Sequence, residues 1–291
     1  MDFYWPLHKR ILYLFLPMHI LWGLINEETR EYIRSANKIH NNDREDYSGK
    51  KLYGEFRNEG GLIWESFDYE KVKNDPYINL INNFFKKKLG KSIRVLEIGP
   101  GGGFLTKYII SNENIKTYTG IEISNYFAEC LKKRFDEIGK NQFLVINGDA
   151  LEEIMRLEEN KFDLIILASS LHHLPDRDKL FIELARVLDK KGEILIKEPC
   201  HYLPRIADLI RKILFQKDVN GNSYLSAKHF CRQKMIAIHH FLSLEEIKFY
   251  ISKTQNLKIN IVKYKFGRNK FYKLLFKRFA SSQIYMSILK N

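Results

Sequence analysis

Cysteine is scarce in this 291-residue chain, and that scarcity excludes two ways of stabilising a small domain. The three cysteines, Cys130, Cys200 and Cys231, show no paired spacing. A disulfide framework and a cysteine-based zinc site both require such pairs. We therefore expect a reduced, cytoplasmic protein. Hydrophobic residues make up 45% of the chain, which is enough for a folded core.

The chain also lacks an apolar run long enough to cross a membrane. The longest candidate, residues 11–25, is interrupted by Pro17 and His19 and falls short of the ~20 residues that a spanning helix needs. No small-residue cleavage site of a signal peptide follows it. We expect a helix that packs on the main domain or lies in a membrane interface.

Acidic residues are absent from the last part of the sequence. Residues 251–291 contain ten Lys or Arg and no Asp or Glu, in a chain of net charge +13. Within them, residues 265–282 alternate basic and aromatic side chains. Three interpretations stay open: a solvated Lys-rich helix, a helix lying on an anionic membrane, or a nucleic-acid contact. No RNA-binding module can be identified in the sequence.

The most informative segment that is present runs from residue 93 to 103, Ile-Arg-Val-Leu-Glu-Ile-Gly-Pro-Gly-Gly-Gly. It predicts a buried strand followed by a turn in which Gly99, Gly101 and Gly103 let a ligand approach the backbone. The turn does not fit G-x-G-x-x-G, because Phe104 or Thr106 stands at the third glycine position. No Gly-Lys-Ser/Thr closes it as in a P-loop.

Acidic residues follow the next two predicted strands. Glu122 stands 19 residues after Gly103, the spacing at which a doubly wound fold presents a carboxylate to ribose hydroxyls. Asp149 follows the third strand. The apolar pattern predicts strands over residues 93–98, 117–123, 142–146, 162–167, 192–198, 258–264 and 283–289.

Three stretches carry a resemblance to a known family. Glu97–Gly103 reads E-x-G-x-G-x-G, Gly148-Asp-Ala150 follows the third strand, and residues 162–176 contain Phe-Asp-x-Ile and His-His-Leu-Pro-Asp. Together they resemble class I S-adenosylmethionine-dependent methyltransferases of the type 11 group, over about residues 90 to 200. The resemblance implies an α/β fold: a Rossmann-like, doubly wound, seven-stranded sheet, mostly parallel with an antiparallel last strand.

The resemblance also implies a cofactor and a set of binding residues. S-adenosyl-L-methionine would lie over the glycine turn, with Glu122 on the ribose, Asp149 on the adenine amine and the amide of Ala150 against the ring. The implied cofactor-binding residues are Glu97, Gly99, Gly101, Gly103, Glu122, Ile123, Asp149, Ala150 and Ser169. No metal-binding spacing is visible, and we expect no metal site.

Candidates for proton transfer follow the fourth strand. His172 and His173 stand near the expected position of the methyl group, and one of them could act as a general base. A structural role for both in the loop is an open alternative.

Family members that methylate amino groups of adenine or glutamine carry Asp/Asn-Pro-Pro-Tyr/Phe after the fourth strand, whereas this chain has Ala168-Ser-Ser-Leu171. The Pro-Cys nucleophile of cytosine C5 methylation is absent as well.

The domain organisation follows from these segments. Residues 1–70 form a helical extension or lid, in which Tyr53, Phe56 and Trp64 are either lid aromatics or core residues. Residues 71–291 form the methyltransferase domain, with a substrate-recognition insertion at 199–241 and the basic amphipathic segment at 265–282.

The expected function is therefore enzymatic methyl transfer to oxygen or nitrogen. The acceptor would be a small molecule, a glycan or a lipid-linked intermediate, with peripheral membrane contact if the basic segment binds lipid. The alternatives are an RNA-modifying methyltransferase and an inactive methyltransferase fold that serves as a binding module. The sequence leaves the oligomeric state open.

Overall fold

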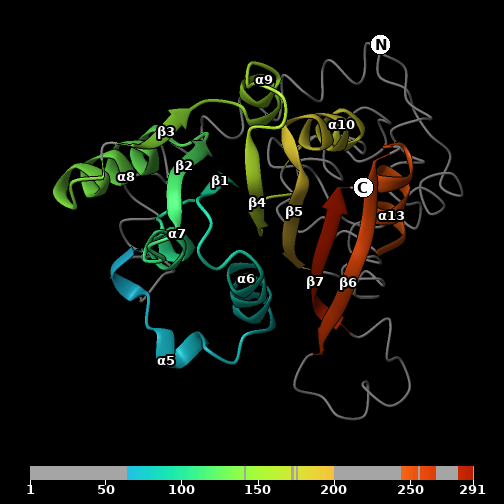
Figure 1. Ribbon diagram of the computed structural model, residues 1–291, viewed down its shortest axis with the longest axis horizontal. Helices are drawn as coiled ribbons and strands as arrows, with labels where there is room; N and C mark the ends of the chain where they lie inside the picture. Colours follow the sequence, from blue (N-terminus) through green and yellow to red (C-terminus); the bar gives the residue numbers. More distant parts are fainter. Residues whose placement is uncertain are drawn as a thin grey trace, which may run out of the picture.

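The computed structural model describes residues 64–140, 142–171, 174, 176–199, 244–254, 256–266 and 281–290, which build one sheet with helices on both faces (Figure 1). The strands are β1 (Ile93–Ile98), β2 (Ile115–Glu122), β3 (Phe143–Asn147), β4 (Phe162–Ala168), β5 (Leu188–Pro199), β6 (Leu257–Phe266) and β7 (Ser281–Lys290). The helices are η2 (Trp64–Ser66), α5 (Tyr69–Val72), α6 (Pro76–Lys87), α7 (Phe104–Ile110), α8 (Asn125–Glu137), α9 (Ala150–Met155), α10 (Arg177–Val187) and α13 (Leu244–Ser252).

The strand order is β3-β2-β1-β4-β5-β7-β6. Strands β1 to β5 pair in parallel, whereas β7 runs antiparallel to both β5 and β6. The expected Rossmann-like, doubly wound, seven-stranded sheet with an antiparallel last strand is confirmed. The seven strands that we predicted from the apolar pattern are all present, with ends that differ by a few residues.

The sheet separates two hydrophobic layers, because successive side chains of a strand point to opposite faces. On β1, Val95 belongs to the layer packed by α6, α7 and α8, and Leu96 to the layer packed by α9, α10 and α13. Both side chains are fully buried. Burial on both faces explains why the strand reads as an almost continuous apolar run.

Two helices with a short break between them, α5 and α6, precede β1. The carboxylate of Asp75 accepts a hydrogen bond from the amide of Tyr77 at 2.8 Å, and Pro76 is the first helical residue. A capping acid followed by proline is a strong helix start, which explains the break.

Strand β5 begins earlier than the predicted strand over residues 192–198, and it contains a bulge near its start. Phe162 pairs with Leu188 and Leu164 pairs with Glu193, so one residue of β4 lies opposite four residues of β5, 189–192. Gly192 is required in this bulge, because an added Cβ would come within 2.5 Å of Leu188.

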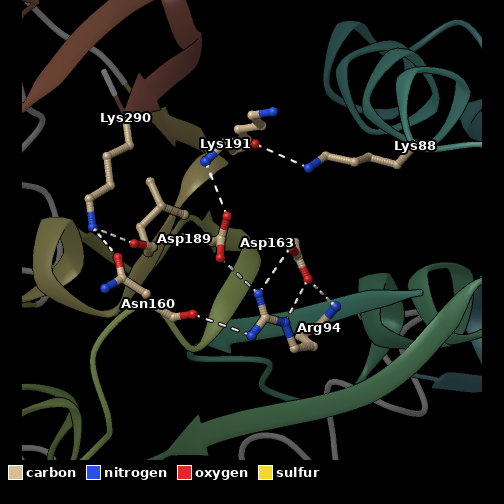
Figure 2. Close-up of polar contacts among 8 residues, drawn as sticks. Lys88, Arg94, Asn160, Asp163, Asp189, Lys191 and Lys290 are labelled. Carbon is tan, nitrogen blue, oxygen red and sulfur yellow. Dashed lines mark hydrogen bonds and ion pairs between the residues drawn. The ribbon is translucent and has the colours of Figure 1, made fainter. Parts of the chain in front are cut away.

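A polar cluster ties strands together at the amino-terminal edge of the sheet (Figure 2). Arg94 on β1 donates to Asp163 on β4 at 2.9 and 3.2 Å, and to Asp189 at 3.1 Å. Lys290 at the end of β7 donates to Asn160 at 2.9 Å. Burial alone would raise the pKa of Asp163, but the hydrogen bonds and charge of Arg94 outweigh it and lower that pKa.

Several sequence-based predictions fall outside the described residues. They include the apolar segment 11–25, Tyr53 and Phe56, residues 200–241 of the insertion, and residues 267–280 of the basic segment. Peripheral membrane contact therefore remains a prediction from the sequence. In the part of the chain that the structure describes, none of the helices is both long and apolar enough to cross a membrane.

Candidate functional site at the carboxyl edge of the sheet

The fold itself singles out one position for ligand binding. After β1 the chain moves outward through β2 and β3, and it then returns to place β4 on the other side of β1. The carboxyl ends of β1 and β4 therefore flank the point where the strand order reverses (Figure 1). Open α/β sheets bind ligands outside the strand ends at such a switch point.

The glycine turn after β1 lies at this switch point. Gly99, Gly101 and Gly103 all have positive φ, at 68°, 55° and 79°. An added Cβ would lie 2.9 Å from Ser170 at Gly99 and 2.6 Å from Leu131 at Gly103, so close packing requires these two glycines. At Gly101 an added Cβ would have no atom of the described residues within 4 Å. Among these residues nothing covers the backbone at Gly101, and a ligand could approach it there.

Glu122, at the end of β2, is tied to this turn. One carboxylate oxygen, Oε2, accepts from the amide of Gly101 at 2.8 Å, and the other, Oε1, accepts from the amide of Ser124 at 2.9 Å. The side chain is only 6% exposed. Glu122 is therefore held in one orientation, and a carboxylate oxygen can accept more than one hydrogen bond.

Glu97 lies inside the protein beneath the turn. It is 2% exposed, and its Oε2 accepts hydrogen bonds from the hydroxyls of Thr106 at 2.8 Å and Tyr118 at 2.7 Å. Burial raises the pKa of Glu97 to about 7, the two hydroxyl hydrogen bonds oppose this rise, and the nearby charge of Glu122 adds to it. Glu97 is thus an acid that can gain or lose a proton near neutral pH.

The end of β3 brings Asp149 to the same edge. The side-chain amide of Asn147 donates to the carbonyl oxygens of Glu122 at 2.9 Å and Ile123 at 3.2 Å, which joins the ends of β2 and β3. Asp149 also caps α9, since its Oδ1 accepts from the amides of Leu151 at 3.0 Å and Glu152 at 3.2 Å. Its other oxygen has no hydrogen-bond partner among the described residues. Ala150, the first residue of α9, is buried.

Two serines after β4 differ sharply in their surroundings. Ser169 has φ 61° and an exposed side chain, and its amide donates to the carbonyl of Lys197 at 2.7 Å. Ser170 is buried against Gly99, and its hydroxyl oxygen has no hydrogen-bond partner among the described residues. The family resemblance implied Ser169 and not Ser170, because nothing in the sequence tells which of two adjacent serines turns inward.

Glu198 holds the end of the same loop. It is fully buried at the end of β5, and its Oε1 accepts from the amide of Leu171 at 2.7 Å. The two histidines that we predicted as candidate bases, His172 and His173, follow directly and lie outside the described residues. Their role in proton transfer stays a prediction.

Trp64 covers the outer side of the glycine turn. Its backbone amide donates to the carbonyl of Gly102 at 2.8 Å, and its ring packs edge-on against Phe135 of α8 at 6.5 Å between centroids. It would also be 3.0 Å from a Cβ at Gly103. Of the two interpretations of this tryptophan, core packing is the one that its contacts support.

The described residues fit a nucleoside cofactor such as S-adenosylmethionine. Gly101 provides open backbone, Glu122 is a fixed acceptor for hydroxyl groups, and Ser170 has an unsatisfied buried hydroxyl. Buried polar groups without a partner are rare in folded proteins and often mark an absent ligand or water. The described residues contain no group of three His, Cys, Asp or Glu side chains that could hold a metal ion.

Comparison with known proteins gives an independent result for the same part of the chain. Residues 96–196 match the family model described as "Methyltransferase domain". This range begins in β1 and ends in β5, and so includes the glycine turn, Glu122, Asp149 and both serines.

Curated relatives match over longer ranges at modest identity. The polyketide synthase component of lovastatin nonaketide synthase from Aspergillus terreus is 25% identical over 197 residues, which is 62% of this chain and 6% of the relative. Squalestatin hexaketide synthase from a Phoma species is 31% identical over 153 residues, 49% of this chain and 6% of the relative. Phosphoethanolamine N-methyltransferase 2 of Caenorhabditis elegans is 25% identical over 122 residues, 42% of this chain and 27% of the relative.

Solved structures share the fold at low identity. A candidate sarcosine dimethylglycine methyltransferase from Galdieria sulphuraria superposes with a TM-score of 0.55 at 15% identity, and the match covers 84% of this chain and 98% of that protein. The MccD protein superposes with a TM-score of 0.50 at 14% identity, covering 72% of this chain and 96% of that protein.

Proposed function

Because the chain carries a class I S-adenosylmethionine-dependent methyltransferase domain of the type 11 group, we propose that the whole protein transfers a methyl group to a small-molecule, glycan or lipid-linked acceptor. When bound, S-adenosylmethionine supplies a methyl group on a positively charged sulfur, which is already electrophilic. The protein then contributes mainly alignment and exclusion of water.

The observation that carries this proposal is the order of acceptor groups along the carboxyl edge. Asp149 follows β3, Glu122 ends β2, the open backbone of Gly101 follows β1, and Ser170 follows β4. An adenine, a ribose and a sulfur-bearing chain are joined in that order in the cofactor. In this arrangement Asp149 accepts from the adenine amine, Glu122 accepts from the ribose hydroxyls, and the reacting end lies between β1 and β4.

For the methyl acceptor we propose a chemical class rather than one compound. Phosphoethanolamine N-methyltransferase 2 is named for a small amine, and the polyketide synthases are named for small products. These names favour a small molecule over a macromolecule. We propose His172 and His173 as candidate bases for an acceptor that must lose a proton, because histidine titrates near neutral pH.

Calorimetric titration of the full-length chain with S-adenosylhomocysteine tests the cofactor assignment. We expect binding by the parent protein and at least tenfold weaker binding by Glu122→Ala, because two charge-assisted hydrogen bonds of roughly 1.5–3 kcal/mol each are lost. Glu129→Gln is a matched control, since Glu129 is an exposed acid of α8 that contacts Asn125. Equal affinity of Glu122→Ala and the parent would refute the ribose assignment.

The same titration tests the first alternative, and a filter-binding assay tests the second. An inactive fold without cofactor would give no heat with either S-adenosylmethionine or S-adenosylhomocysteine. An RNA-modifying enzyme would retain a short RNA on a filter and release it steeply with salt, because counterion release drives such binding. Binding of the cofactor without RNA retention is the outcome that we expect.

A further inference from the structure

Glu97 differs from the other acids at the carboxyl edge in how its charge is stabilised. Glu122 accepts from two backbone amides, and Glu198 accepts from the amide of Leu171. Glu97 accepts only from two hydroxyls, and both bonds go to the same oxygen, Oε2. Among the described residues no Lys or Arg makes an ion pair with Glu97. A buried carboxylate without a cation or amide donors is costly in its charged form.

The groups around Glu97 do not supply a positive charge either. Helix α7 contributes the Thr106 hydroxyl, and β2 contributes Tyr118 and Glu122. From α6 comes Tyr77, whose own pKa is raised by burial and then by the charges of Glu97 and of Glu198 on β5.

The remaining neighbour of β1 is β4, which pairs with it through buried Ile and Leu residues. Among the described residues, every titratable group that faces Glu97 is therefore an acid or a phenol. A cation bound close to Glu97 would favour its ionised form.

We propose that Glu97 makes the site distinguish the charged cofactor from its neutral product, by releasing a proton when the sulfonium form binds and regaining one after the methyl group has left. This inference rests on the proposed function. The proton passes to solvent on binding and returns from solvent once the sulfur is an uncharged thioether. Glu97 thus acts through its charge on the affinity of the site, and takes no part in bond making.

The direction of the pH effect follows from linkage. Burial raises the pKa of Glu97 to about 7, so the carboxyl is mostly neutral at about pH 6 and mostly ionised at about pH 8. A bound cation favours the ionised form. The affinity for S-adenosylmethionine, relative to S-adenosylhomocysteine, should therefore increase as the pH rises. A cation that lowers this pKa by about one unit changes the relative affinity by about tenfold in full, of which about fivefold falls between pH 6 and pH 8. A drop of about half a unit gives about threefold in full and about 2.5-fold in that window.

The test is calorimetric titration of the full-length protein with both compounds at about pH 6, 7 and 8. The compounds share their adenosine and amino acid parts, so the contacts that they have in common cancel in the ratio of the two Kd values. We expect S-adenosylmethionine to gain about 2.5-fold to fivefold over S-adenosylhomocysteine from pH 6 to pH 8. Titrations at pH 7 in two buffers of different ionisation heat should show more proton release with S-adenosylmethionine.

Two variants assign the effect to Glu97. Glu97→Gln keeps an oxygen that can accept from Thr106 and Tyr118, and its ratio of Kd values should be independent of pH. Glu193→Gln is the control: Glu193 is a buried acid of β5 that accepts from the Ser287 hydroxyl and from Lys87, and its removal should leave the parent's pH dependence.

A ratio that stays constant with pH in the parent protein would overturn the proposal, and so would parent-like pH dependence in a folded Glu97→Gln. If Glu97→Gln does not fold, the proposal is tested by proton release in the parent protein, which should be greater with S-adenosylmethionine than with S-adenosylhomocysteine. Equal proton release with the two compounds would then overturn the proposal. Failure to bind either compound at any pH would instead refute the proposed function, so the two failures are distinguishable.

Discussion

At the scale of single residues, Glu122 and Ser170 differ in whether their polar side-chain atoms are hydrogen-bonded. Each oxygen of Glu122 accepts from a backbone amide, whereas the buried hydroxyl of Ser170 has no partner in the part of the chain that the structure describes. The first residue holds the ligand-facing edge in place before any ligand arrives. The second costs stability until something bonds to it.

Ser170→Ala should stabilise the ligand-free protein. Removing a buried hydroxyl without a partner recovers its desolvation penalty, about 1 kcal/mol in the free energy of unfolding. Urea denaturation without ligand measures the change. Ser111→Ala is the control, since the Ser111 hydroxyl donates to the carbonyl of Tyr108 at 2.7 Å and its loss should not stabilise the fold. A less stable Ser170→Ala would mean that the hydroxyl does have a partner.

Glu122→Gln should be more damaging than its small change in shape suggests. Both carboxylate oxygens face N–H groups, so the amide nitrogen of glutamine would oppose the N–H of either Gly101 or Ser124. We expect a loss of about 1–3 kcal/mol of stability together with weaker binding of S-adenosylhomocysteine. Thermal unfolding and calorimetry on one sample would show both. Parent-like values for both would contradict the described role of Glu122.

At the scale of elements, the glycine turn has two roles, close packing and an open backbone, and different glycines supply them. Gly103 lets the start of α7 pack against Leu131 of α8 and Trp64 of η2. Gly101 has no such contact and keeps the backbone open. Substitutions at the two positions should therefore affect different properties.

Gly103→Ala should mainly reduce stability, and Gly101→Ala should mainly reduce ligand binding. At both positions a positive φ costs an alanine about 1–2 kcal/mol. The contact of 2.6 Å with Leu131 adds an overpacking cost of about 1–3 kcal/mol at Gly103 alone. Unfolding curves and Kd values for S-adenosylhomocysteine, each compared with the parent, separate the two effects. If Gly101→Ala bound the ligand as tightly as the parent, the open space above Gly101 would not be the binding position.

At the scale of the whole molecule, the two edges of the sheet have different roles. At the amino-terminal edge Arg94 forms ion pairs with Asp163 and Asp189 (Figure 2). The carboxyl edge instead gathers buried acids, Glu97, Glu122 and Glu198. Ion pairs thus join the strands at one edge, and the groups suited to ligand binding lie at the other.

Arg94→Ala should destabilise the protein at neutral pH by about 2 kcal/mol, because Asp163 loses its partner in a mostly buried position. The pKa of folded Asp163 lies below its unfolded value of about 3.9. The pair therefore contributes fully above about pH 4, and its contribution is lost as the pH falls through the folded pKa. Urea unfolding of parent and variant should give a difference that shrinks toward pH 2. A difference that is constant with pH would contradict this assignment.

The sequence by itself determined the strands, the glycine turn and the spacing of the acids. Fully buried strands such as β1 and β4 read as short apolar runs with turn residues at their ends, and these signals are local. The positions of Glu122 and Asp149 followed from the same strand ends, which parallel strands bring to one edge. The added role of Asp149 as a helix cap came only with the structure.

Only the tertiary structure decided which partner each polar group has. Glu97 meets Tyr118 from β2 and Thr106 from α7, and Gly99 meets Ser170 from beyond β4, across separations that no local pattern encodes. The inward turn of Ser170 rather than Ser169, and the protonation behaviour of Glu97, follow from these contacts. Burial and hydrogen bonding depend on neighbours in space, and those neighbours are fixed only when the two hydrophobic layers close on the sheet.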